Sequence, residues 1–478
     1  MESAILTKIW LSLPDAQRRL IAKAVHSPLF NQREEVARLL EFIEKQASQT
    51  PAKNRSRKTD GFTKEAAFQY VFAKKPQKTT VYDDGKMRHL MAYLLEVIRN
   101  CLAWQDWNSE PSNVNLHLCY ALKKSGVTEF WEKELERSKA ALAQSTFRHD
   151  GYYFQQFALE QEIWELGRQK HRSGIDNVEA LNSSFGVFVA VNSFRQGCSL
   201  LAQKSMSNVS AIIPYLQETL RLAEQGYFRD NAAVETWHAS YVALTEPENE
   251  AHFLRLKELL AQNGEVFPNP DLRDLYILAL NVCIRRINAA DKKYMREAFD
   301  LYRGGLARRV FLENGYLSKT TYRNVMNIAV GVGEWDWAFS YLQEFQPFLS
   351  PKDRENIYRY NLATYYFRKQ EYNAALELLR HVELREMLEN FDARRMMVRM
   401  YYELGEFQAL ESLLDSFDIY LRRHREGGYH REMYRNFVRF MRKMVIPAKR
   451  STAEQNKLKK EITQTEYLAE REWLLSLD

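Results

Sequence analysis

The chain has 478 residues, a formal net charge of +6, 45% hydrophobic residues and 27% charged residues. This composition is typical of a folded protein and excludes a largely disordered chain, and the longest apolar run, Val187 to Val191, is far shorter than the roughly 20 residues of a membrane-spanning helix. Because the length exceeds the roughly 250 to 300 residues that one hydrophobic core supports, we expect several domains or an extended array.

Residues 1–146 are predicted to form a separate helical region. The apolar stretch at its start contains Glu2 and Lys8 and lacks a small-residue cleavage site, so it does not resemble a signal peptide, and a cytoplasmic location is expected. A basic linker at residues 47–60 and a loop at residues 74–85 interrupt the region, and we expect both to be mobile. The predicted helices lie near residues 14–25, 32–46, 62–73 and 86–107.

The four cysteines are widely spaced, with no C-x-x-C motif and no nearby pair of histidines. This spacing argues against a disulfide framework and against a structural zinc site. We predict that the thiols are buried and that the protein uses no metal and no cofactor. The cysteines are Cys101, Cys119, Cys198 and Cys283.

Residues 147–310 are predicted to form helical hairpins without a regular period. Apolar residues recur there at intervals of three and four, which indicates helices. A weak repeat unit is expected at the end of this region, with Tyr276 to Ile287 as its first helix and Lys292 to Tyr302 as its second. We predict no strand, and we interpret Asn263-Gly264 and Asn314-Gly315 as the ends of helices.

Residues 311–446 contain three segments with a common pattern, in which Trp335, Tyr372 and Phe407 take one equivalent position at intervals of 37 and 35 residues. Each aromatic residue is expected to open the second helix of an antiparallel pair. One pair cannot cover its own apolar faces, so the pairs are predicted to stack into a curved α-solenoid with a concave groove. The accompanying positions are Gly333, Gln370 and Gly405; Ala338, Ala375 and Leu410; Leu342, Leu379 and Leu414; and Met326, Ala363 and Val398.

This pattern resembles the tetratricopeptide repeat, whose period is about 34 residues. Gln370 departs from the usual turn glycine, and Leu410 departs from the usual alanine. The resemblance implies an all-α fold of stacked helix pairs, and we take Trp335 as a core residue whose replacement by alanine costs about 3 to 5 kcal/mol. Residues 447–478 are predicted to add one amphipathic helix that caps the solenoid.

Most of the chain is also similar to a family of uncharacterised bacterial proteins of about this length. The similarity is carried by specific strings rather than by a loose pattern, and it implies a tetratricopeptide-like helical protein without an assigned activity. The strings are Ser27 to Asn31, Cys283 to Asn288, Leu312 to Gly315, Ala409 to Phe417 (ALESLLDSF), Tyr420 to Arg423, and His430-Arg431.

The groove of the predicted solenoid is the first candidate site. Arg323, Asn327 and Asn361 resemble the residues that hold a peptide carboxylate in one subclass of this fold, whereas Asp392 and Met396 depart from that pattern. A guanidinium binds a carboxylate or a phosphate through two parallel hydrogen bonds. The groove therefore either binds an acidic peptide or is merely solvated. The residues predicted to line it are Arg323, Asn327, Val330, Tyr360, Asn361, Thr364, Phe367, Arg395, Arg399 and Tyr402.

A basic stripe near the C-terminus is the second candidate site. Arg431, Arg435, Arg439 and Arg442 are spaced by four, four and three residues, which places them on one face of a helix. Such a face could bind phosphates together with the linker at residues 53–58, or it could touch a membrane surface. It could also be a solvated edge with acidic neighbours from an adjacent helix. An apolar stripe runs beside it, formed by Tyr434, Val438, Met441 and Val445.

Signatures of catalysis are absent from the sequence. There is no Walker A, H-E-x-x-H or G-x-S-x-G motif, and Gly331-Val332-Gly333 lacks the third glycine of a dinucleotide fingerprint. We therefore predict no catalytic residues and a non-enzymatic adaptor that holds a protein or an acidic peptide in the groove. In this hypothesis Arg323→Glu combined with Arg395→Glu abolishes partner binding at an unchanged melting temperature. Nucleic-acid binding is the alternative.

Overall fold

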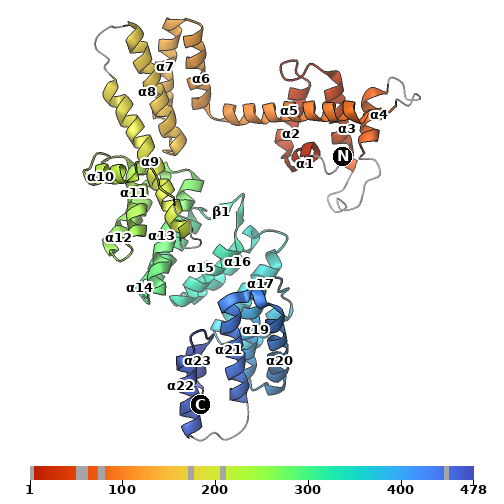
Figure 1. Ribbon diagram of the computed structural model, residues 1–478, viewed down its shortest axis with the longest axis vertical. Coiled ribbons are helices and arrows are strands. Elements are labelled where there is room, and N and C mark those ends of the chain that lie inside the picture. The colour runs from red at the N-terminus through yellow and green to blue at the C-terminus, as the bar shows by residue number, and fades with distance from the viewer. Residues whose placement is uncertain are drawn as a thin grey trace. The chain divides into compact units, whose positions relative to one another are not determined.

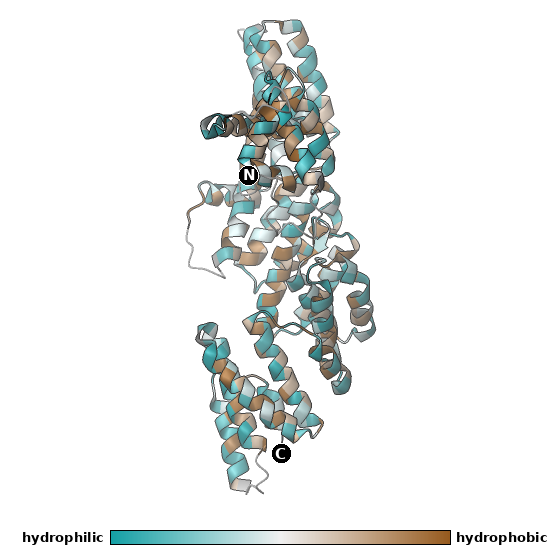
Figure 2. Ribbon diagram, turned by 90° about the vertical axis from the view of Figure 1, so that its right-hand side faces the viewer, coloured by the Kyte–Doolittle hydropathy of each residue, from teal (hydrophilic) through white to brown (hydrophobic). Residues whose placement is uncertain are grey.

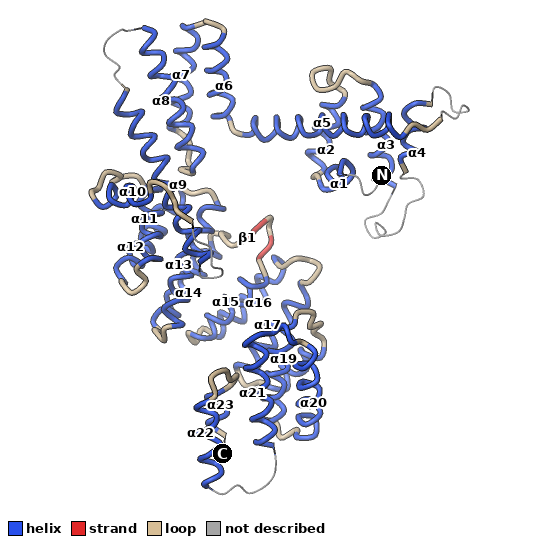
Figure 3. The backbone as a smooth tube through the Cα atoms, viewed as in Figure 1, coloured by secondary structure: helices blue, strands red, loops and turns tan. Residues whose placement is uncertain are grey.

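The computed structural model describes residues 5–49, 63–73, 81–170, 177–204, 211–445 and 452–477. Within these ranges the chain forms 23 α-helices and one two-stranded hairpin, so the predicted all-α class is confirmed (Figures 1 and 3). Residues 50–60 of the predicted basic linker, including its 53–58 segment, lie outside the described ranges.

The chain divides into two compact units. The first comprises Met1–Thr146 and Asp150–Phe188, and the second comprises Phe147–His149 and Val189–Asp478. The division falls inside helix α9 (Val178–Lys204), so the first unit extends beyond the region 1–146 that the sequence suggested.

The first unit contains the hydrophobic core that the N-terminal helices share. Ile21, Leu39, Ile43, Leu94 and Ile98 are almost wholly buried in it. The four helices predicted from the sequence correspond to α2 to α5, and α1 was not predicted. The helices are α1 (Ile5–Ser12), α2 (Asp15–Val25), α3 (Glu34–Gln49), α4 (Lys64–Phe72), α5 (Asp84–Ser109), α6 (Pro111–Lys124), α7 (Thr128–Ala143) and α8 (Asp150–Lys170).

The second unit is a succession of helices in which neighbours along the chain contact each other. Contacts join α11 to α12, α13 to α14, α15 to α16, α17 to α18 and α19 to α20, and α15 also contacts α17. The α-helices are α10 (Leu216–Glu224), α11 (Ala232–Thr245), α12 (Glu250–Asn263), α13 (Asn269–Asn288), α14 (Lys293–Ala307), α15 (Lys319–Gly331), α16 (Trp335–Phe345), α17 (Arg354–Arg368), α18 (Tyr372–Arg380), α19 (Met387–Glu403), α20 (Phe407–Arg423), α21 (Gly428–Val445), α22 (Thr452–Gln464) and α23 (Arg471–Ser476). Short 3₁₀ turns occupy Gly264–Val266, Gln346–Phe348 and Arg425–Gly427.

The three aromatic residues aligned in the sequence occupy equivalent places in the structure, because each is the first residue of its helix, α16, α18 or α20. The turn before each helix also repeats. The residue two positions before the aromatic residue has a positive φ in each turn: 86° at Gly333, 63° at Gln370 and 72° at Gly405. In all three turns the next amide donates to a carbonyl of the preceding helix five residues back, as in a Schellman motif.

Gln370 is the one turn position of the three where a residue with a side chain adopts the left-handed conformation. That conformation costs an L-residue about 1 to 2 kcal/mol, which exceeds the 0.5–1 kcal/mol entropic cost of a glycine. We therefore expect Gln370→Gly to raise stability by about 0.5 kcal/mol, and Gly405→Ala, where a Cβ would meet no atom within 4 Å, to lower it by about 1 kcal/mol. Thermal unfolding checks both, and a lower midpoint for Gln370→Gly would contradict the interpretation.

The small and apolar positions of the repeat form the core of the second unit. Ala338, Ala375, Leu342 and Leu414 are at most 2% exposed. Trp335, by contrast, is only partly buried and contacts the ring of Tyr365 edge-on, with 5.8 Å between ring centres. The prediction that Trp335 is a core residue is therefore wrong, and its replacement by alanine should cost less than about 3 kcal/mol.

The segment between α14 and α15 corrects the prediction that the chain contains no strand. Leu312–Glu313 (β1) pairs antiparallel with Tyr316–Leu317 (β2) around Asn314 and Gly315, whose φ values are 51° and 82° (Figure 3). The physical reason is that Asn-Gly suits a two-residue hairpin turn in which both residues need positive φ. At Asn263 the prediction holds, since α12 ends there.

The C-terminal region also differs from the prediction. Instead of one capping helix, the described residues form α22 and α23, which are separated at Glu470 by a left-handed residue with φ 55°. Both helices contribute to the core, because Ile462 and Leu474 are completely buried against α19 to α21.

Hydrophobic and hydrophilic residues are interspersed along the helices (Figure 2). No helix in the described ranges combines the length and the apolar character that crossing a lipid bilayer would require. The four cysteines are buried and free, as predicted, and burial raises the pKa of the Cys283 thiol to about 12.

Candidate functional site

A groove of about 830 Å³ lies over α15, α17 and α19 in the second unit. Most of its lining belongs to the face that the repeat pattern predicted, because helix periodicity places those residues on one side of α15, α17 and α19. The predicted residues that line it are Arg323, Asn327, Val330, Tyr360, Thr364, Phe367, Arg395 and Arg399.

Two predicted groove residues lie elsewhere. Asn361 is 2% exposed, and its side-chain amide donates to the carbonyl of Ile357 at 2.7 Å, next to a smaller pocket of about 160 Å³. Tyr402 packs edge-on against Trp473, with 5.5 Å between ring centres. Both residues were predicted to line the groove from their places in the repeat pattern. That pattern does not reveal that Tyr402 packs against α23.

The groove also contains residues that the sequence did not indicate. Arg368 follows Thr364 by one helical turn, so helix periodicity could have found it. His430 and Tyr434 belong to α21, and Glu470 is the residue immediately before α23. No local pattern connects Glu470 with residues on α19 that lie 71 and 75 positions earlier.

Arg395 is the centre of a polar network at the floor of the groove. Its Nε donates to Asp392 Oδ1 at 2.9 Å, and Tyr360 donates its hydroxyl hydrogen to Asp392 Oδ2 at 2.9 Å. Arg395 also pairs with Glu470, and both side chains are only 14% exposed. Burial by itself would lower the pKa of Arg395, but the carboxylates of Asp392 and Glu470 outweigh it and raise that pKa.

Glu470 is held by two arginines. Besides the pair with Arg395, its Oε2 accepts a hydrogen bond from Arg399 Nη1 at 2.7 Å. Both guanidinium groups lie over the ring of Phe367, at 5.2 Å and 5.5 Å from its centre. The aromatic ring therefore helps to fix the two cations that bind this carboxylate.

Two further arginines in the groove have no carboxylate partner. Arg323 and Arg368 are exposed, and within the described part of the chain neither forms an ion pair. Desolvation by the surrounding groove, followed by the charge of Arg395, lowers the pKa of Arg368. Four arginines against Asp392 and Glu470 leave the groove lining with a net charge of +2.

Among the described residues, the groove lining contains two buried polar atoms without a hydrogen-bond partner, Asn327 Oδ1 and Arg399 Nε. Asn327 Oδ1 is buried, and no donor in the described residues hydrogen-bonds to it. A buried amide group without a hydrogen bond costs about 1 to 3 kcal/mol.

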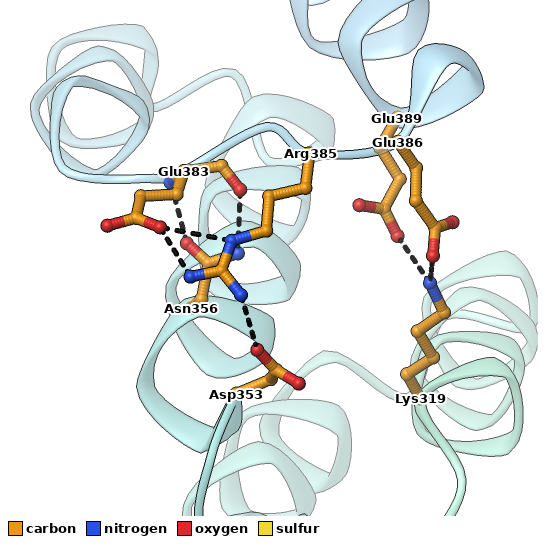
Figure 4. Close-up of polar contacts among 7 residues, drawn as sticks. All are labelled: Lys319, Asp353, Asn356, Glu383, Arg385, Glu386 and Glu389. Carbon is orange, nitrogen blue, oxygen red and sulfur yellow. Dashed lines mark hydrogen bonds and ion pairs between the residues drawn. The ribbon is translucent and has the colours of Figure 1, made fainter. Parts of the chain in front are cut away.

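The segment between α18 and α19 is fixed beside the groove (Figure 4). The side chain of Asn356 in α17 forms two hydrogen bonds with the backbone of Glu383. Its amide nitrogen donates to the carbonyl at 2.9 Å, and its Oδ1 accepts from the N–H at 2.6 Å. Arg385 pairs with Asp353 at 3.1 Å, and Lys319 of α15 pairs with Glu386. The hydrogen bond that Lys319 donates to the carboxylate of Glu386 raises the pKa of Lys319.

The basic stripe of α21 divides into two kinds of arginine. Arg431 donates to the carbonyl of Leu421 at 2.6 Å, and Arg442 pairs with Asp415 at 2.7 Å. Two of the four arginines therefore bind residues of α20. Arg435 and Arg439 are exposed. The apolar stripe beside them is buried at Tyr434, Val438 and Met441 and partly buried at Val445.

No group of three or more His, Cys, Asp or Glu side chains in the described ranges is arranged to hold a metal ion. The chain matches no family model, no curated protein and no solved structure.

Proposed function

We propose that the protein is a non-enzymatic adaptor that binds an acidic segment of a partner protein in the groove of α15, α17 and α19. In this proposal the contacting helix pairs from α11 to α20 form a tetratricopeptide-like solenoid, and the groove is its concave face. The repeated turns before α16, α18 and α20 support that interpretation.

One observation carries the proposal: Arg323 and Arg368 line the groove and form no ion pair with any described residue, while Arg395 and Arg399 both bind the carboxylate of Glu470. Hydrogen bonds between guanidinium and carboxylate groups are about twice as strong as neutral ones. Glu470 provides an internal example of how the groove holds a carboxylate. A partner that brings further acidic side chains would neutralise the remaining arginines.

The groove also suits the backbone of a peptide. Asn356, which lines the adjacent smaller pocket and not the groove, binds both the N–H and the carbonyl of Glu383, which is the way an asparagine side chain can hold a peptide unit. From Tyr360 to Arg368 the groove follows α17 over eight residue steps, about 12 Å at 1.5 Å each. That length accommodates about four residues of extended peptide at ~3.3 Å each.

We expect Arg323→Glu combined with Arg368→Glu to weaken binding of an amidated, fluorescein-labelled hexaglutamate peptide at least tenfold, because attraction becomes repulsion. The melting temperature should change little, because neither side chain forms an ion pair with a described residue that the substitution would remove. Arg368 replaces Arg395 in this test because Arg395 holds internal carboxylates. Fluorescence anisotropy in about 50 mM salt, where exposed charges are weakly screened, measures the affinity.

A matched control is Arg435→Glu combined with Arg439→Glu, which changes the net charge equally on exposed arginines of α21. This variant should bind hexaglutamate as the unaltered protein does, and hexaglutamine should bind to neither. Equal losses in the two double variants would show that net charge, rather than the groove, attracts the peptide. No binding of hexaglutamate to the unaltered protein would remove the proposal.

A further inference from the structure

Glu470 places a carboxylate of the protein itself inside the groove. Its two oxygens face Arg395 and Arg399, and its side chain is 14% exposed. These arginines come from α19, one of the three helices that line the proposed partner site. The chain therefore supplies an acidic residue at the place where an acidic partner would bind.

The element that carries Glu470 is small. Helix α23 has six residues, far fewer than the roughly 12 to 15 that an isolated helix needs in water, so it depends on its tertiary contacts. Those contacts centre on Trp473 and Leu474, which are buried. The indole N–H of Trp473 donates to Glu403 Oε1 at 2.6 Å, and its ring packs against Tyr402 and Phe437. Glu470 itself has φ 55°, a left-handed conformation that is unfavourable for a residue with a side chain.

We propose that α23 with Glu470 is a displaceable internal ligand of the groove. Arg395 and Arg399 form a carboxylate subsite, which Glu470 occupies in the closed state and an acidic residue of the partner occupies after α23 leaves. This inference rests on the proposed function of the groove. It adds a second subsite beside Arg323 and Arg368, and it makes the affinity for a partner depend on how often α23 is released.

Competition of this kind has a defined consequence. When only a fraction of molecules has the subsite open, the apparent affinity for an external ligand falls by that fraction. Release of Glu470 would leave four arginines against Asp392 alone, a net charge of +3 in the groove lining. Removing the negative charge of Glu470 should therefore strengthen binding of an acidic peptide.

The test compares Glu470→Gln with Glu472→Gln, an exposed residue in the first turn of α23 without an ion pair among the described residues. We expect Glu470→Gln to bind labelled hexaglutamate at least fivefold more tightly than the unaltered protein, and Glu472→Gln to bind it equally. Unchanged or weaker binding by Glu470→Gln would overturn the inference, since Glu470 would then only support the structure.

A second measurement uses the unaltered protein and does not depend on how a variant folds. Saturating hexaglutamate should accelerate amide hydrogen exchange of residues 472–476 at least tenfold, whereas hexaglutamine should leave it unchanged. Binding of hexaglutamate without faster exchange there would overturn the inference and leave the proposed groove function intact. A complete lack of binding would remove both.

Discussion

Arg395→Met is expected to destabilise the second unit by about 3 kcal/mol. Arg395 is the shared partner of Asp392 and Glu470, and its side chain is 14% exposed. Removing one member of a buried ion pair costs about 3 to 5 kcal/mol, because it leaves an uncompensated charge away from water. We take the lower end of that range because Asp392 is 35% exposed.

A matched control for this prediction is Arg385→Met. Arg385 also pairs with two carboxylates, Asp353 and Glu383, but its side chain is 62% exposed (Figure 4). Exposed pairs contribute about 0 to 1 kcal/mol, so we expect a loss below about 1 kcal/mol there. Urea unfolding of both variants measures the difference. Similar losses would contradict the view that burial makes Arg395 important.

The double variant Arg395→Met with Glu470→Gln tests the origin of the effect. Once Glu470 is neutral, one of the two unpaired charges is gone, so the double variant should lose less stability than the two single variants together. Side chains in direct contact show such coupling energies of about 0.5 to 3 kcal/mol. Simple additivity would indicate that Arg395 acts through its contact with Phe367 instead.

Leu414→Ala is expected to cost about 2 to 5 kcal/mol. Leu414 of α20 is 2% exposed, in the cluster that also holds Phe417, Leu421 and Phe437. Truncating such a side chain removes buried apolar surface and leaves a cavity, and both effects destabilise the folded state. Urea unfolding measures the loss.

Phe407→Ala is the matched control on the same helix. Phe407 occupies the repeat position of Trp335 and Tyr372, yet it is 49% exposed. We therefore expect it to cost less than about 1 kcal/mol, although phenylalanine is the larger residue. A greater loss for Phe407→Ala than for Leu414→Ala would mean that the aromatic repeat position, rather than the leucine position, supports the core.

Much of the repeat region could be predicted because its signals are local. Trp335, Tyr372 and Phe407 do begin helices, and Gly333 and Gly405 do adopt positive φ. The degree of burial could not be read in the same way. A large aromatic residue at a repeat position suggests a core residue, but neighbouring helices leave Phe407 half exposed.

The groove was predictable to the extent that it follows helix periodicity. Arg323, Tyr360 and Arg395 share one face because each occupies an equivalent place on its helix. Asp392 was interpreted as a departure from a basic pattern, whereas in the structure it fixes Arg395 and accepts a hydrogen bond from Tyr360. Its role depends on an interhelical contact that no single helix reveals.

The amino-acid sequence by itself determined the helices, the repeated turns and the face of α15, α17 and α19 that lines the groove, because these follow from contacts within a few residues of each other. Only the tertiary structure decided which charges in the groove are occupied. It brings Glu470 to Arg395 and Arg399 across more than 70 residues of chain, and it leaves Arg323 and Arg368 without an ion pair in the part of the chain that the structure describes. Ion pairs over such a separation depend on how the helices pack, and no local pattern encodes that packing.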